Sequence, residues 1–254
     1  MPASPTLAPA ALLAEVPRGN TQKHVNRTVL AYLLGLGPLH RPGLRWLDLP
    51  CGAGELLGQV GRLFPGARRW GADVRTAAPP APVRYAPTDL SQEFPFANEP
   101  AFDIITSISG IMCFGNTAQF IGRCAARLAP GGLLVVSNDN CLTMRDRLSY
   151  LFTGRVRRFR LLFEPDEGNH QLVQHQELKR LFDVHGLELK RVLYTAFYLE
   201  DLLYVPLAAL LWPWQWLQLR RLRSSTGHAH RAELFGFKSL LHRHYVFVGE
   251  KRAA

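Results

Sequence analysis

The chain has little cysteine. Its 254 residues include four cysteines, and no two of them form a C-x-x-C pair or show the spacing of zinc ligands. This pattern excludes a disulfide scaffold and predicts reduced, mostly buried thiols in a cytoplasmic protein without a metal site. The four residues are Cys51, Cys113, Cys124 and Cys141.

Positive charge is missing from the start of the sequence. The first basic side chain is Arg18, so the opening residues lack the basic start of a secretory signal or a transit peptide. They are rich in proline and alanine instead, which predicts a disordered tail over residues 1–20. The remaining residues, 21–254, have an ordinary globular composition and are expected to form one domain.

A hydrophobic run long enough to cross a bilayer is also missing. Residues 202–219 contain no charge, but Pro206 and Pro213 interrupt them, and a spanning helix needs about 20 apolar residues. Tryptophans 212, 214 and 216 followed by Arg220, Arg221 and Arg223 are typical of the interfacial zone of a membrane. Residues 202–223 are therefore expected to lie on an anionic membrane surface. The alternative is an internal helix that covers the substrate pocket or a dimer interface.

The chain is organised around residues 47–54, which read L-D-L-P-C-G-A-G. An apolar run meets a glycine pair and opens into helical spacing, which predicts strand, tight turn and helix. The Lys-Ser/Thr pair of a phosphate-binding loop is absent, and a carboxylate at Asp48 suits an ammonium better than a pyrophosphate. Asp73 follows Asp48 by 25 residues, close to the spacing at which a carboxylate reaches ribose hydroxyls. These features predict a ligand with a ribose, a positive charge and no phosphate.

Five segments in order resemble the motifs of class I S-adenosylmethionine-dependent methyltransferases. They are L-D-L-P-C-G-A-G, G-A-D-V at 71–74, residues 86–90, residues 102–109 and L-A-P-G-G-L-L-V-V-S at 128–137, which is similar to the family's turn into strand five. The resemblance implies an α/β fold, a Rossmann-like sheet of seven strands that is mostly parallel, with the last strand antiparallel and helices on both faces. Pro50 departs from the glycine of many members. The residues that the resemblance assigns to S-adenosylmethionine are Asp48, Pro50, Cys51, Gly52, Gly54, Asp73, Asp89, Leu90 and Ile108, with Ser109 a further lining candidate.

Helical spacing over residues 21–34 predicts a helix that, in similar methyltransferases, lies over the cofactor. On it, His24 and Asn26 are candidates to face the ligand, and exposed polar positions on a packed helix are the favoured interpretation of both. Three prolines between residues 75 and 82 exclude a regular helix after the second strand. Residues 145–185 are expected to cover the substrate, and residues 199–240 form an apolar insertion between strands six and seven.

The segment after the fourth strand predicts the kind of methyl acceptor. The Asn/Asp-Pro-Pro-aromatic tetrad of enzymes that methylate base amino groups is absent, and Cys113 does not follow a proline as a cytosine-methylating cysteine would. Methylation at oxygen or carbon of a smaller acceptor remains, and oxygen is favoured. A hydroxyl acceptor needs a base within hydrogen-bond reach. His170, in an N-H pair, is the candidate base.

The distribution of charge along the sequence bears on the partner of the protein. The formal net charge of +10 is uneven: residues 1–140 carry +3 and residues 141–254 carry +7. With the apolar insertion, this favours a small or lipid-linked acceptor and a peripheral position on the inner face of a membrane. RNA methylation is an alternative that the basic charge favours and the missing tetrad opposes. A third possibility is a non-catalytic membrane-binding or partner-binding protein that kept the fold.

Overall fold

The computed structural model describes residues 9–18, 21–79, 82–155, 157, 171–221 and 230–252. A seven-stranded sheet of order β3-β2-β1-β4-β5-β7-β6 runs through the molecule. Strands β1 to β5 pair in parallel, and β7 lies antiparallel between β5 and β6. The predicted fold class, including the antiparallel last strand, is confirmed. The strands are β1 Arg45–Asp48, β2 Arg68–Asp73, β3 Arg84–Pro87, β4 Phe102–Ile108, β5 Leu128–Asp139, β6 Leu187–Thr195 and β7 His244–Lys251.

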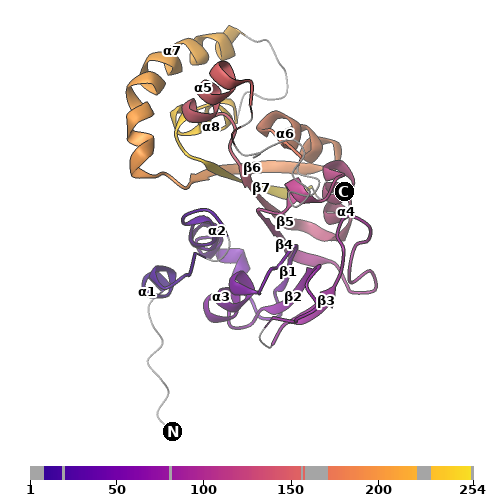
Figure 1. Ribbon diagram of the computed structural model, residues 1–254. Helices are drawn as coiled ribbons and strands as arrows, with labels where there is room; N and C mark the ends of the chain where they lie inside the picture. Colours follow the sequence, from indigo (N-terminus) through magenta and orange to yellow (C-terminus); the bar gives the residue numbers. More distant parts are fainter. Residues whose placement is uncertain are drawn as a thin grey trace.

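Helices cover both faces of the sheet. In Figure 1, α1, α2 and α3 lie on one side of the strands and α4 and α6 on the other. Strand residues alternate between the two faces because side chains in a strand have a period of two. In β7, for example, Val246 and Val248 join the core under α2 and α3, while Tyr245 and Phe247 join the core under α4 and α6. The helices are α1 Pro9–Ala14, α2 Val25–Leu34, α3 Glu55–Leu63, α4 Thr117–Arg127, α5 Met144–Thr153, α6 His175–Val184, α7 Val205–Arg221 and α8 Arg231–Leu234.

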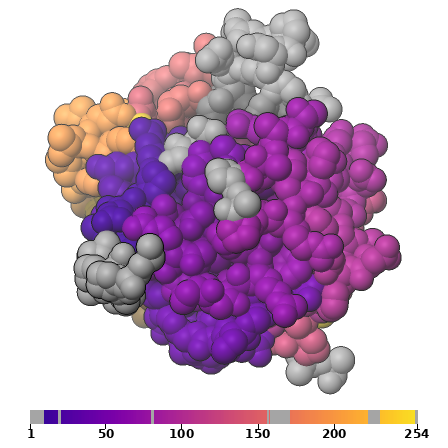
Figure 2. Space-filling view, turned by 90° about the horizontal axis from the view of Figure 1, so that it is seen from below, coloured from indigo at the N-terminus to yellow at the C-terminus, as the bar shows by residue number. Residues whose placement is uncertain are grey.

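Three helices, α5, α7 and α8, and two short 3-10 helices lie together at one end of the molecule. The short 3-10 helices η3, Leu199–Tyr204, and η4, Phe237–Leu240, pack with α5 and α7 around a small core of four buried residues. Figure 1 shows α5, α7 and α8 together at this end, beyond β6 and β7. Figure 2, seen from the other end, shows a face formed mostly by the N-terminal half, with α7 projecting at its edge. Of the predicted apolar insertion, residues 199–240, the structure describes 199–221, which form η3 and α7, and 230–240.

The structure differs from expectation at three places. A short helix, α1, lies within the tail expected to be disordered, because Leu12 and Leu13 pack against the core under α2. Helix α2 begins at Val25 rather than at residue 21, after a left-handed residue at His24. Strand β5 begins at Leu128, where a turn was expected, because Leu128 pairs with Phe102 before the register shifts.

The crossover between β2 and β3 follows the proline-based prediction as far as the structure describes it. Residues 74–79 and 82–83 contain no helix. Pro79 packs directly against the glycine turn that follows β1. The irregular crossover thereby closes one side of the turn.

Candidate active site

The site lies at the carboxyl ends of β1, β2 and β4. In this sheet the chain order reverses between β1 and β4, and ligands of open α/β sheets bind in the crevice at such a switch point. A cavity of about 360 Å³ opens there. Its walls are formed by Thr21, Asn26, Asp48, Pro50, Cys51, Gly52, Glu55, Leu56, Asp73, Val74, Arg75, Ile108 and Ser109.

Asp48 ends β1 and is almost fully buried. Burial raises the pKa of its carboxyl to about 7, against the lowering effect of a hydrogen bond that Thr106 Oγ1 donates to Asp48 Oδ1 at 2.6 Å. Trp46 Nε1 donates to Thr106 Oγ1 at 3.1 Å and fixes that hydroxyl. The carboxylate is therefore held in place, but its ionisation is costly until a cation enters the cavity.

Asp73 ends β2 and joins the second strand to the glycine turn. Its Oδ2 accepts a hydrogen bond from the Gly52 amide at 2.9 Å, and its Oδ1 accepts one from the Arg75 amide at 3.2 Å. These bonds hold the carboxylate at the rim of the cavity, where its remaining lone pairs are available to hydroxyl donors. Such a position suits a ribose.

The turn between β1 and α3 depends on two glycines with positive φ. Gly52 has φ of 55° and lines the cavity, and Gly54 has φ of 82° and precedes α3. A Cβ on Gly54 would collide with the side chain of Pro79. The turn therefore needs glycine at both positions for backbone conformation, and at Gly54 also for space.

Asn26 corrects an expectation. It was expected to be exposed on α2, but it is 5% exposed and lines the cavity. Its Oδ1 has no hydrogen-bond partner among the described residues, and a buried polar atom without a partner is costly. The amide is therefore available to a ligand. The sequence signal for it was weak, because a single asparagine on an amphipathic helix is usually solvated.

The lining has an acidic balance that fits S-adenosylmethionine. Three carboxylates, Asp48, Asp73 and Glu55, face one guanidinium, that of Arg75. A cavity of this sign favours a ligand with ammonium and sulfonium charges and disfavours a pyrophosphate. When bound, S-adenosylmethionine supplies an electrophilic methyl group. We expect Asp48 and Asn26 to hold its amino acid part and Asp73 its ribose.

The predicted site residues fall into three groups. Seven of them line the cavity: Asp48, Pro50, Cys51, Gly52, Asp73, Ile108 and Ser109. Gly54 lies behind the turn, and Asp89 and Leu90 follow β3 without forming part of the cavity wall. Asp89 is exposed, and its Oδ1 accepts from the amide and hydroxyl of Ser91 at 2.9 and 2.7 Å. An adenine contact at Asp89 and Leu90 remains a prediction.

His170, the predicted base, lies outside the described residues. The sequence interpretation also missed Glu55, Arg75 and the Trp46–Thr106 pair behind Asp48. Thr106 is a polar residue in the mostly apolar strand β4, and this was the feature of the sequence that could have predicted the Trp46–Thr106 pair. Within the described ranges, no group of three or more His, Cys, Asp or Glu residues could hold a metal ion.

Comparisons with known proteins agree with this geometry. Residues 21–192 match a family described as "Methyltransferase domain". A ubiquinone biosynthesis O-methyltransferase from Rhizobium etli is 31% identical over 159 residues, which are 58% of this chain and 61% of that relative. The chain thus matches about three fifths of the length of this curated relative.

Two solved structures share the fold. A cyclopropane synthase from Mycobacterium tuberculosis has a TM-score of 0.56 at 18% identity, covering 98% of this chain and 95% of the other. A phosphoethanolamine N-methyltransferase from Haemonchus contortus, solved with S-adenosyl-L-methionine, has a TM-score of 0.54 at 17% identity. The match covers 97% of this chain and 58% of the other. By its motifs, its sheet order and the family match over residues 21–192, the chain belongs to the class I S-adenosylmethionine-dependent methyltransferases.

Proposed function

We propose that this methyltransferase methylates an oxygen atom of a small or lipid-linked acceptor at the surface of an anionic membrane, on its cytoplasmic side. The choice of oxygen is supported by the relatives named O-methyltransferases and by the absence of the amino-methylation tetrad after β4. The acceptor and the membrane surface are argued from the apolar insertion. The described residues include no helix long and apolar enough to cross a bilayer, so the proposed association is at the surface.

The observation that carries the membrane proposal is an apolar stripe on the outer face of the apolar insertion. Leu207, Leu210, Trp214 and Leu217 of α7 are spaced by three, four and three residues, which places them on one helical face, and Leu203 of η3 precedes them. All five are exposed, and Leu210 is 79% exposed. A soluble helix normally presents such a stripe to the core, so this one is free to face a partner that the described residues do not supply.

More apolar side chains extend this surface. Twelve of the fourteen exposed large hydrophobic side chains among the described residues lie on α5, η3 or α7. Those on α5 are Tyr150, Leu151 and Phe152, and Phe152 is 79% exposed. The exposed apolar residues are therefore concentrated at one end of the molecule rather than scattered over it. We call these twelve side chains, which include the stripe, the apolar surface.

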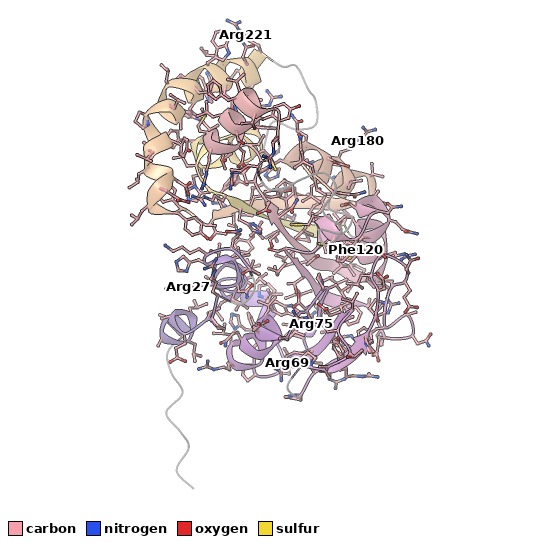
Figure 3. All side chains as sticks on the ribbon, in the orientation of Figure 1. Arg27, Arg69, Arg75, Phe120, Arg180 and Arg221 are labelled. Carbon is pink, nitrogen blue, oxygen red and sulfur yellow. The ribbon has the colours of Figure 1, made fainter. Side chains whose placement is uncertain are left out.

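Positive charge borders the apolar surface. Arg220 and Arg221 end α7, and the Arg220 guanidinium lies 3.6 Å from the centre of the Trp216 ring. Figure 3 shows Arg221 pointing away from the rest of the molecule. Arginine beside tryptophan suits the headgroup region of a bilayer, where guanidiniums bind phosphate and indole rings lie at the polar boundary. An anionic membrane fits this pattern better than a second protein copy, whose docking would not need the bordering cations.

A second cavity supports a partly apolar acceptor. It has a volume of about 610 Å³ and is lined by Cys141, Asp146, Arg147, Tyr150, Leu151, Leu172 and Gln174. Arg147 donates to Gln215 Oε1 of α7 at 2.8 Å, so α5 and the apolar insertion are joined beside this cavity. We expect an apolar chain of the acceptor to lie there, with Arg147 near any anionic group.

Two measurements test the proposal. Flotation with vesicles of phosphatidylglycerol and phosphatidylcholine should carry the protein, and vesicles of phosphatidylcholine alone should carry much less. Transfer of labelled methyl from S-adenosylmethionine should be compared for 4-methylphenol and 4-dodecylphenol, each with and without anionic vesicles. Vesicles should raise the rate only for the dodecyl compound. A protein that stays in solution as a dimer, with no binding to either vesicle, would overturn the membrane part.

A further inference from the structure

We propose that Ser109, His244 and Asp139 form a proton relay that removes the proton of the acceptor hydroxyl during methyl transfer. Ser109 Oγ lies 3.2 Å from His244 Nε2, and His244 Nδ1 lies 3.3 Å from Asp139 Oδ1. The three residues come from the segment after β4, from β7 and from the end of β5, far apart in the sequence. The inference rests on the proposed oxygen methylation, which needs a base.

The carboxylate fixes the direction of the relay. An ionised carboxylate only accepts hydrogen bonds, so the relay requires that His244 Nδ1 carry a proton and donate it to Asp139. His244 Nε2 is then the unprotonated nitrogen and accepts from the Ser109 hydroxyl. His244 is 1% exposed, so it cannot touch an acceptor itself. Ser109 is the group through which the imidazole reaches the cavity.

Ser109 is held in an unusual conformation. Its φ is 55°, in the left-handed region that costs a residue with a side chain of the order of 1 kcal/mol. Its amide donates to Ser137 Oγ at 3.0 Å and to the Ser137 carbonyl at 3.3 Å, which hold it there. Backbone strain of this kind persists where the surrounding structure enforces it, and such positions cluster at functional sites.

The relay reaches the cavity at the right place for the reaction. Ser109 follows β4 directly and lines the same wall as Ile108, while Asp48 ends the neighbouring strand β1. These two strands flank the switch point where the cofactor is expected. An acceptor hydroxyl that enters the cavity beside Ser109 would therefore lie on the β4 side of the cavity.

Atoms and electrons balance in the proposed step. A lone pair of the acceptor oxygen forms the bond to the methyl carbon, and the electrons of the carbon–sulfur bond return to sulfur, which becomes a neutral thioether. The acceptor proton passes to Ser109 Oγ as the Ser109 proton passes to His244 Nε2. The imidazolium pairs with the Asp139 carboxylate and later loses its proton to water. Ser109 would be the catalytic residue, His244 the proton acceptor acting through it, and Asp139 a positioning residue.

Two phenols of different acidity can show whether Ser109 and His244 transfer a proton or only support the structure. At pH 8, 4-nitrophenol is largely ionised and needs no base, whereas 4-methylphenol keeps its proton. Ser109→Ala and His244→Gln should lower kcat/KM for 4-methylphenol about a hundredfold and for 4-nitrophenol less than about threefold. An equal loss for both phenols would overturn the relay. Ser107→Ala is the matched control, because Ser107 Oγ is buried in β4 without a partner among the described residues.

A second measurement does not need turnover. Nitrogen-15 NMR of the full-length protein should show His244 protonated at Nδ1 and bare at Nε2, and Asp139→Asn should shift this tautomer balance. A wild-type His244 protonated at Nε2 would overturn the proposal. If wild-type protein methylates neither phenol, methylation of phenolic oxygen fails, and the tautomer still decides for or against the relay geometry.

Discussion

The two ends of the molecule place polar and apolar groups in opposite ways. Around the cavity, carboxylates and an asparagine are buried, each on a strand end or helix that a large core supports. Around α7, leucines and tryptophans are exposed over a core of four buried residues. Burying polar groups and exposing apolar groups both cost stability, so each end is built for a ligand of different chemistry. The cavity suits a small cation, and the membrane proposal assigns the apolar surface to a lipid phase.

The largest effect is expected at the buried end. Asp73→Ala removes the acceptor of the Gly52 amide and the proposed acceptor of the ribose hydroxyls, so affinity for S-adenosylmethionine should fall by about 4 kcal/mol, roughly a thousandfold. Isothermal titration calorimetry measures the loss. Asp183→Ala is the control, since Asp183 pairs with Lys179 on the exposed side of α6. Unchanged affinity in Asp73→Ala would mean that the cofactor does not use this carboxylate.

Asp48 should show a conflict between stability and binding. Its carboxyl has a pKa raised to about 7, so the folded protein binds a proton that the unfolded chain releases near pH 4, and the free energy of unfolding falls as pH rises between these values. Asp48→Asn removes this loss and should raise the stability of ligand-free protein at pH 8 by about 2–4 kcal/mol, while weakening cofactor binding.

Thermal melting at pH 4.5 and pH 8 measures the Asp48 effect. The stabilisation should be largest at pH 8 and small at pH 4.5, where the wild-type carboxyl is protonated. A variant that is less stable than wild type at pH 8 would show that the Thr106 hydrogen bond outweighs burial.

At the exposed end, the change should act on membranes and leave folding alone. Leu210→Ser with Trp214→Ser removes two exposed apolar side chains, which should weaken binding to anionic vesicles by about 2 kcal/mol, roughly thirtyfold. The melting temperature should stay within about 2 °C, because neither side chain supports the core. Val184→Ser on α6, equally exposed but distant from α7, is the control. If the double variant bound anionic vesicles as tightly as Val184→Ser, the apolar surface would not be the part of the protein that binds lipid.

The smallest effect is expected at Asn26. Asn26→Ala removes a buried amide whose Oδ1 lacks a partner among the described residues, so the ligand-free protein should keep its stability or gain slightly. Affinity for S-adenosylmethionine should fall by about 1 kcal/mol, roughly fivefold, by calorimetry. A destabilised variant with full affinity would assign Asn26 to packing of α2.

The sequence predicted most of the architecture because the motifs lie on strands and their turns. Asp48, Gly52 and Asp73 have fixed spacings that only a strand, turn and helix can satisfy, and the sheet order follows from the family resemblance. The burial of Asn26 could not be predicted, since it depends on how α2 lies over the cavity. The Ser109–His244–Asp139 cluster was hidden as well, because β7 brings His244 to β4 and β5 across more than one hundred residues.

The position of β7 between β5 and β6 has a consequence during synthesis. Both neighbours leave the ribosome before β7, yet among the described residues β6 hydrogen-bonds to the sheet only through β7. A growing chain that has reached β6 can form the glycine turn and the first parallel strands, but it lacks His244 and a partner for β6. Cofactor affinity could therefore arise earlier in biosynthesis than the capacity to turn over an acceptor.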